Sequence, residues 1–134
     1  KPGGIDAAQI VNWKAEGYVE FLGPCSYIKE YLSDISVFVL PSYREGVPKS
    51  TQEAMAIGRA IITTDVPGCR ETVIDGYNGY LVPPWDTQKL ALVMETFIHE
   101  RELIVTMGLN SRRFALSKFN ESESANSLVN IITA

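Results

Sequence analysis

The tetrapeptide Val37–Leu40 (VFVL) most limits what this chain can fold into, because all four of its residues are apolar. A strand with one face in water alternates apolar and polar residues, whereas an unbroken apolar run is expected of a strand buried on both faces. Strands of that kind belong to parallel sheets that are covered by helices. Pro41 follows at once and ends the strand, since proline has no N–H to donate.

Short strand-like segments alternate with helix-like segments along the whole chain. The expected strands are Tyr18–Leu22, Val37–Leu40, Ala60–Thr64 and Tyr80–Val82. The expected helices are Ala7–Glu16 capped by Asp6, Ser26–Leu32, Ser50–Ile57, a single turn at Arg70–Ile74, Asp86 or Thr87 to Glu100, Arg101–Leu116 with a possible break at Gly108, and a last helix from Ser122. This alternation predicts an α/β fold, a parallel sheet of about four strands with flanking helices. Without a repeat or an internal boundary, residues 1–134 are expected to form a single domain.

Composition excludes several classes of protein. The net charge is −4, which argues against nucleic acid as a partner, because proteins that bind it usually carry a basic face. The two cysteines are too few for a disulfide framework, so we expect a reducing, cytoplasmic compartment. Apolar runs such as Val37–Leu40 are far too short to cross a bilayer.

The stretch Ser42–Gly58 (SYREGVPKSTQEAMAIG) predicts a ligand site. It leads from the end of a buried strand through a short loop into a helix, and ligands of parallel sheets bind at the carboxyl ends of the strands. Lys49, Ser50 and Thr51 lie where the helix is expected to begin. Free backbone N–H groups at a helix start favour an anion such as a pyrophosphate, and Lys49 adds positive charge.

Two carboxylates flank this loop, and each has a plainer interpretation. Glu45 can accept hydrogen bonds from sugar hydroxyls, or it can be a solvated loop residue paired with Arg44. Glu53 can bind a ribose, or it can complete the capping box S/T-x-x-E that begins at Ser50. Lys49 can likewise be an ordinary exposed lysine at a helix start. The spacing alone leaves these alternatives open.

Other catalytic chemistries lack the necessary residues. The single histidine, His99, lies within an expected helix and favours a surface position. No Cys/His cluster has metal-ligand spacing, and neither a Walker A loop nor a G-x-G-x-x-G sequence is present. The sequence also lacks an Asp-x-Asp pair that could hold a divalent ion against a pyrophosphate.

Several motifs together resemble the carboxyl-terminal domain of retaining glycosyltransferase family 4, of the GT-B fold. The family has a Glu, seven residues, a second Glu, and then Ala-Met-Ala-x-Gly. Glu45, Glu53 and Ala54–Gly58 match this pattern, and Pro67–Glu71 and Asn78–Pro84 match motifs further along. The resemblance implies that the sheet is the Rossmann-like half of a GT-B enzyme that binds the donor sugar-nucleotide.

The resemblance also assigns roles to residues of this chain. Glu45 is implied to be catalytic and to lie against the donor sugar together with Gly46, Val47 and Pro48. The helix start at Lys49–Thr51 is implied to face the pyrophosphate, and Glu53 the ribose. The base is implied to lie against Phe21, Leu22 and Gly23. Enzymes of this family need no metal and no other cofactor, and they transfer the sugar with retention of configuration.

The loop departs from the common family form, which has an aromatic residue and then a glycine where this chain has Val47 and Pro48. The form REGVPK resembles a subgroup of bacterial polysaccharide and lipid-linked oligosaccharide enzymes. This favours a UDP-sugar, often a UDP-N-acetylhexosamine, as donor and a glycan or lipid-linked acceptor. The parent enzyme is then expected in the cytoplasm, with a possible peripheral position at the membrane.

The family's amino-terminal acceptor domain and the basic residues that clamp its pyrophosphate lie upstream of Lys1. We therefore expect a truncated, inactive donor domain with an exposed strand edge and an apolar patch, through which it can self-associate. Two other functions stay open. One is a sugar-nucleotide epimerase of the same fold, and the other is a non-catalytic module that binds nucleotide or protein.

Overall fold

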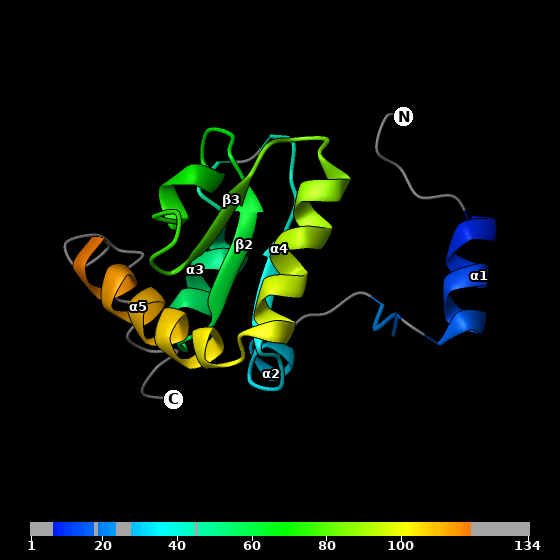
Figure 1. Ribbon diagram of the computed structural model, residues 1–134, viewed down its shortest axis with the longest axis horizontal. Helices are drawn as coiled ribbons and strands as arrows, with labels where there is room; N and C mark the ends of the chain where they lie inside the picture. Colours follow the sequence, from blue (N-terminus) through cyan, green and yellow to red (C-terminus); the bar gives the residue numbers. More distant parts are fainter. Residues whose placement is uncertain (1–6, 18, 24–27, 45, 119–134) are drawn as a thin grey trace.

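The computed structural model describes residues 7–17, 19–23, 28–44 and 46–118 (Figure 1). Its elements are α1 (Ala7–Glu16), α2 (Ile28–Leu32), β1 (Val37–Leu40), α3 (Lys49–Ala56), β2 (Ala60–Thr64), the 3-10 turn η1 (Cys69–Thr72), β3 (Gly79–Val82), α4 (Thr87–His99) and α5 (Glu102–Lys118). The alternation of strands and helices confirms the predicted α/β class.

The three strands form one parallel sheet in the order β1-β2-β3. The central strand β2 is buried at every position, because strands and helices surround it. Gly79 begins β3 directly against β2, where a Cβ atom would lie 1.7 Å from the carbonyl oxygen of Ile61. Any other residue at position 79 would therefore push β3 away from the sheet.

The expected strand Tyr18–Leu22 is wrong. Residues 19–23 form no strand, and Val19 and Leu22 are 45% and 51% exposed. Both residues lie in the described segment 19–23 between α1 and α2 in the chain, and α1 itself is set apart from the sheet (Figure 1). A β-rich pattern becomes a strand only where a neighbouring strand supplies hydrogen bonds, and no described strand lies beside this segment.

The strand β1 corrects a second expectation, because its four residues are only half buried. The reason is its place in the sheet, since among the described strands it pairs with β2 alone. Beside this edge lies an apolar hollow of about 300 Å³, lined in part by Val37, Val39 and Met94. Among the described strands β1 thus lies at an edge of the sheet, while the predicted exposed edge, apolar patch and self-association stay predictions.

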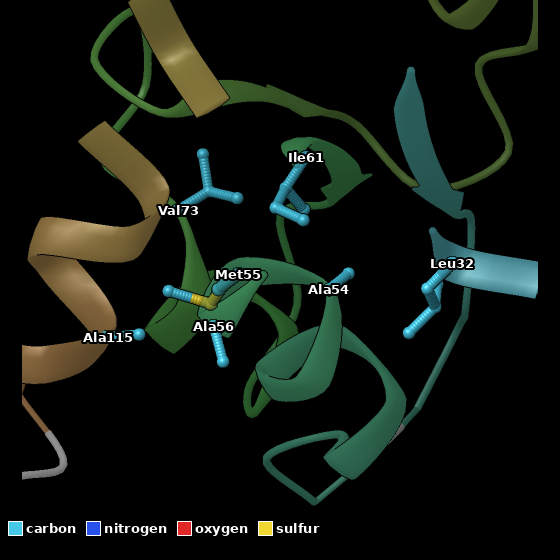
Figure 2. Close-up of a cluster of buried hydrophobic side chains, with 7 residues drawn as sticks. All are labelled: Leu32, Ala54, Met55, Ala56, Ile61, Val73 and Ala115. Carbon is cyan, nitrogen blue, oxygen red and sulfur yellow. The ribbon is translucent and has the colours of Figure 1, made fainter. Parts of the chain in front are cut away.

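Two apolar clusters hold the helices to the faces of the sheet. The alternation of side chains along β2 sends Ile61 to one face and Ile62 to the other. The first cluster joins α2, α3 and α5 to the sheet (Figure 2), and its members are Leu32, Ala54, Met55, Ala56, Ile61, Val73 and Ala115. On the other face, Val93 and Phe97 of α4 and Met107 of α5 pack around Ile62 and Val82.

Most of the predicted helices are confirmed within two residues. The structure keeps α5 continuous through Gly108, where we expected a break. The backbone of Gly108 packs against Gly58, whose carbonyl oxygen would lie 2.2 Å from an added Cβ atom. This glycine therefore serves a close helix contact and does not end the helix. The caps expected at Asp6 and Ser26 and the helix from Ser122 lie outside the described residues.

No helix within the described ranges is long and apolar enough to cross a membrane.

Candidate functional site

The candidate site is the loop that leaves β1 and enters α3. The helix begins at Lys49, one residue before the expected start, with Pro48 as its N-cap. Pro48 has extended backbone angles, φ −72° and ψ 126°, and it has no polar side chain to cap the helix. The first helical hydrogen bond runs from Gln52 N to Pro48 O, at 3.1 Å. The N–H groups of Lys49, Ser50 and Thr51 therefore have no acceptor within the helix.

The capping box predicted as the plainer role of Glu53 is wrong. It needs Ser50 as the N-cap, but Ser50 is the second residue of α3, and no side chain caps this helix. Pro48 has an extended ψ of 126° and is the N-cap, so the helix starts at Lys49, one residue earlier than expected. Glu53 lies one turn into the helix with a half-exposed side chain, so the competing structural role is removed.

The residues proposed for phosphate binding differ in exposure. Lys49 is exposed, Ser50 is half exposed and Thr51 is completely buried. Among the described side chains, the Thr51 hydroxyl is the one buried polar atom without a hydrogen-bond partner. An unpaired buried hydroxyl is unfavourable, so the first turn of α3 contains a polar group that the fold leaves without a hydrogen bond.

Residues that the sequence did not single out hold the loop in place. The side chain of Gln52, 7% exposed, donates from Nε2 to the carbonyl oxygen of Val47 at 3.4 Å. The Thr63 hydroxyl donates to the carbonyl oxygen of Leu40 at 2.8 Å, and the Thr64 hydroxyl donates to that of Ser42. The chain leaving β1 is thus tied to both β2 and α3. Two consecutive threonines at the end of a buried strand were the signal that could have revealed this.

The structure brings together only part of the predicted site. Gly46 and Val47 are exposed, Pro48 is buried, and all three lead directly into the start of α3. Glu45 lies outside the described residues. Phe21–Gly23 belongs to the connection between α1 and α2, which lies apart from the loop after β1 (Figure 1). The described conformation therefore does not place this segment at the site.

Metal-binding and histidine chemistry find no support in the described part of the chain. Within it, no group of three or more His, Cys, Asp or Glu side chains could hold a metal ion. His99 is the exposed last residue of α4, as the sequence indicated.

Two ion pairs at the protein surface involve residues of η1. Lys118 at the end of α5 lies 2.7 Å from Glu71 of η1, and its hydrogen bond and charge lower the pKa of the Glu71 carboxyl. Arg70 pairs with Asp65 after β2 at 3.0 Å. Burial, with smaller effects of Glu100 and Asp75, raises the pKa of Tyr80. These contacts fix η1 beside the sheet.

Comparison with known proteins identifies the family. Residues 3–100 match the family described as Glycosyl transferases group 1. The N,N'-diacetylbacillosaminyl-diphospho-undecaprenol alpha-1,3-N-acetylgalactosaminyltransferase of Campylobacter jejuni is 35% identical over 100 residues, 75% of this chain and 27% of that protein. The capsular polysaccharide biosynthesis glycosyltransferase CapM of Staphylococcus aureus is 34% identical over 90 residues, 67% of this chain and 24% of that protein.

Solved structures give the same fold. The crystal structure of Anabaena Alr3699/HepE in complex with UDP-glucose matches with a TM-score of 0.78 and 24% identity, over 94% of this chain and 35% of that one. The sheet with its flanking helices therefore has the architecture of GT-B glycosyltransferases, with three described strands where about four were expected. The chain spans about a quarter of the length of these two relatives and belongs to the glycosyl transferases group 1 family.

Proposed function

We propose that this chain is the carboxyl-terminal part of the donor-binding domain of a retaining glycosyltransferase of family 4. The parent enzyme transfers a hexosyl or N-acetylhexosaminyl group from a nucleotide-diphosphate sugar to a glycan or lipid-linked acceptor. One observation carries this proposal, namely that α3 begins without a side-chain cap at the carboxyl edge of the sheet. In a chain of this family, that opening suits the diphosphate of a sugar-nucleotide.

The diphosphate site uses the start of α3. The N–H groups of Lys49, Ser50 and Thr51 point along the helix axis towards the loop, where the helix dipole is positive. The exposed ammonium of Lys49 adds a full positive charge at this helix start. This electrostatic stabilisation acts on the leaving nucleoside diphosphate and needs no metal.

The remaining donor contacts follow from the family pattern. Glu45, followed by the backbone N–H groups of Gly46 and Val47, holds the donor sugar, and Glu53 binds the ribose hydroxyls. The absence of a capping box supports the role of Glu53, since that carboxylate is not used to close the helix. The base-binding role of Phe21–Gly23 stays a prediction, because the described conformation holds this segment away from the loop.

The relatives support a UDP-linked donor and a glycan acceptor. One is named for transfer of N-acetylgalactosamine to a diphospho-undecaprenol carrier, and another for capsular polysaccharide biosynthesis. The Anabaena structure contains UDP-glucose. We therefore favour a UDP-sugar, an acceptor held by a separate domain, and a parent enzyme in the cytoplasm, where it can approach the membrane surface.

An amide NMR titration with UDP, UDP-N-acetylglucosamine, UDP-N-acetylgalactosamine and GDP-mannose tests this function. We expect the amide signals of Gly46, Ser50 and Glu53 to shift with the UDP compounds and to change less with GDP-mannose. Inorganic pyrophosphate separates the phosphate contribution from that of the base. If none of these compounds shifts the amide signals at the α3 start at millimolar concentration, the proposed donor site is contradicted.

A further inference from the structure

A second candidate site lies at the same edge of the sheet, between the loop after β1 and the turn after β3. A cavity of about 130 Å³ opens there, and its walls include Pro41, Tyr43, Thr64, Val82, Trp85 and Asp86. Ligand pockets for drug-sized molecules are larger, roughly 300–1,000 Å³. The space therefore suits one small ring and not a whole sugar-nucleotide.

The turn after β3 holds Trp85 in an unfavourable backbone conformation. A hydrogen bond from Asp86 N to Pro83 O, 3.3 Å long, closes this turn, and Trp85 occupies its third position with φ 69°. Pro84 precedes it, so the turn is of type II, in which the third position favours glycine. Trp85 is the one non-glycine residue with positive φ in the described part of the chain. Strain of this kind persists chiefly at functional positions.

Burial does not explain the tryptophan, because 63% of its surface is exposed. Its ring stacks on that of Tyr43, with centroids 3.6 Å apart and planes 12° from parallel. The stack covers one face of each ring, and the high exposure of Trp85 leaves its other face open to solvent. Two loops thus combine to present a flat, oriented aromatic face beside the cavity.

The side chains around this aromatic face favour a ligand ring that is neutral and carries hydroxyl groups. The cavity lining contains no lysine or arginine, so it offers nothing to balance a phosphate. Asp86 and Thr87 contribute a carboxylate and a hydroxyl, which can bond to sugar hydroxyls. The C–H bonds on one side of a pyranose ring carry partial positive charge, and they pack well on the negative face of an indole.

We propose that Trp85, supported by Tyr43, is a stacking platform for a sugar ring of the glycan acceptor. That the ligand is a glycan rests on the proposed function. Because the cavity is small and its lining has no cation, the platform suits a sugar ring and not the nucleotide.

Tryptophan fluorescence tests the platform directly in the chain with Trp13→Phe, which leaves Trp85 as the only tryptophan. The probes are cellotetraose, maltotetraose and the N-acetylglucosamine tetramer. We expect at least one of them to shift the emission of Trp85 to shorter wavelength, and saturation-transfer NMR to show contact with one face of its rings. No change with any of the three sugars, or a shift with uridine in place of the sugars, would overturn the proposal.

The variant Trp85→Gly separates the platform from a structural role. Glycine adopts a positive φ without strain, so this variant should keep its fold and its melting temperature. We expect it to bind the sugar about two- to tenfold more weakly, as for the loss of one stacking contact. Trp85→Phe should restore part of the binding, and unchanged sugar affinity in Trp85→Gly would refute the platform.

A parallel UDP titration distinguishes this inference from the proposed function. If UDP shifts Ser50 in wild type and in Trp85→Gly while no sugar binds, the platform is wrong and the donor site stands. If a sugar binds at Trp85 while UDP shifts nothing, the donor site is wrong and the platform stands.

Discussion

Two helices start at the same edge of the sheet, and they differ in whether a side chain caps the backbone N–H groups of the first turn. The helix α4 follows β3, and the carboxylate of Asp86 accepts the N–H of Lys89 at 2.9 Å, so its start is capped. The helix α3 follows β1 and begins at Lys49, and its N-cap residue Pro48 provides no side-chain hydrogen bond. A side chain therefore caps the first turn of α4, while the first N–H groups of α3 have no side-chain acceptor.

This difference separates a helix start that is capped by a side chain from one that we propose binds an anion. A carboxylate at the start of α4 occupies the place that an anion would take. At α3 the loop is instead held from behind, by Gln52 and by the threonines that end β2. The chain thus keeps the loop ordered without filling the anion position.

A charge reversal at each helix start gives the largest expected contrast. Lys49 and Lys89 are both exposed and both lie in a first turn. We expect Lys49→Glu to weaken UDP binding about tenfold, or ~1.4 kcal/mol, by repelling the diphosphate. Lys89→Glu makes the same charge change at the capped helix and should leave the affinity within about twofold. Calorimetric titration measures both, and equal losses would show a general charge effect without a site.

Removal of a hydroxyl or carboxylate tests which residue caps which helix. Asp86→Ala should lower the free energy of unfolding by about 1 kcal/mol, because it removes a true N-cap. Ser50→Ala should change it by less than about 0.5 kcal/mol, because Ser50 lies inside α3. Urea denaturation followed by circular dichroism measures both values. If Ser50→Ala lowers the free energy of unfolding as much as Asp86→Ala does, Ser50 caps α3 after all, and the capping box is correct.

The hydrogen bond that holds the α3 loop should affect stability about as much as the Asp86 cap does, and UDP binding less than Lys49 does. Gln52→Met keeps the length of the side chain and removes its hydrogen bond to Val47. We expect about 1 kcal/mol lower stability and about threefold weaker UDP binding, since the loop loses its preformed shape. The matched change at α4, Gln88→Met, alters an exposed side chain and should affect neither quantity. UDP affinity unchanged in Gln52→Met would show that this bond does not shape the site.

A carboxylate away from both helix starts gives the smallest expected effect. Lys118 lowers the pKa of Glu71 below its ordinary value of 4.5. The stabilisation is therefore present above about pH 4.5 and is lost as the pH falls through the lowered pKa of the folded state. Urea midpoints between pH 6 and pH 3 should fall slightly less steeply in Glu71→Gln than in wild type. If the urea midpoint of Glu71→Gln falls more steeply with pH than that of wild type, the ion pair does not stabilise the fold in the way proposed.

Local patterns were enough to predict most of the fold. The strands β1 and β2 and the bounds of α1 and α4 follow from apolar runs, Asp86 and Gly17, whose effects act within a few residues. Tyr18–Leu22 failed because a strand depends on a neighbour that its own sequence does not specify. The break expected at Gly108 does not occur, because this glycine contacts Gly58, which lies in a distant part of the chain that local sequence does not reveal.

The site was predictable to the same extent. The loop Gly46–Pro48 and the helix start follow from one continuous stretch, so their juxtaposition was correctly expected. Gln52, Thr63 and Thr64 were missed because their partners are loop carbonyls, which only the folded chain identifies. The strained turn at Trp85 was also hidden, since a Pro-Pro-Trp-Asp sequence reveals no φ angle.

The most direct test of the central claim compares the two helix starts in one experiment. In an amide NMR titration with UDP, the signals of Lys49, Ser50 and Thr51 should shift progressively, while those of Thr87, Gln88 and Lys89 stay in place. That result would show that the uncapped helix binds the diphosphate. Shifts of equal size at both helices, or at α4 alone, would contradict the account.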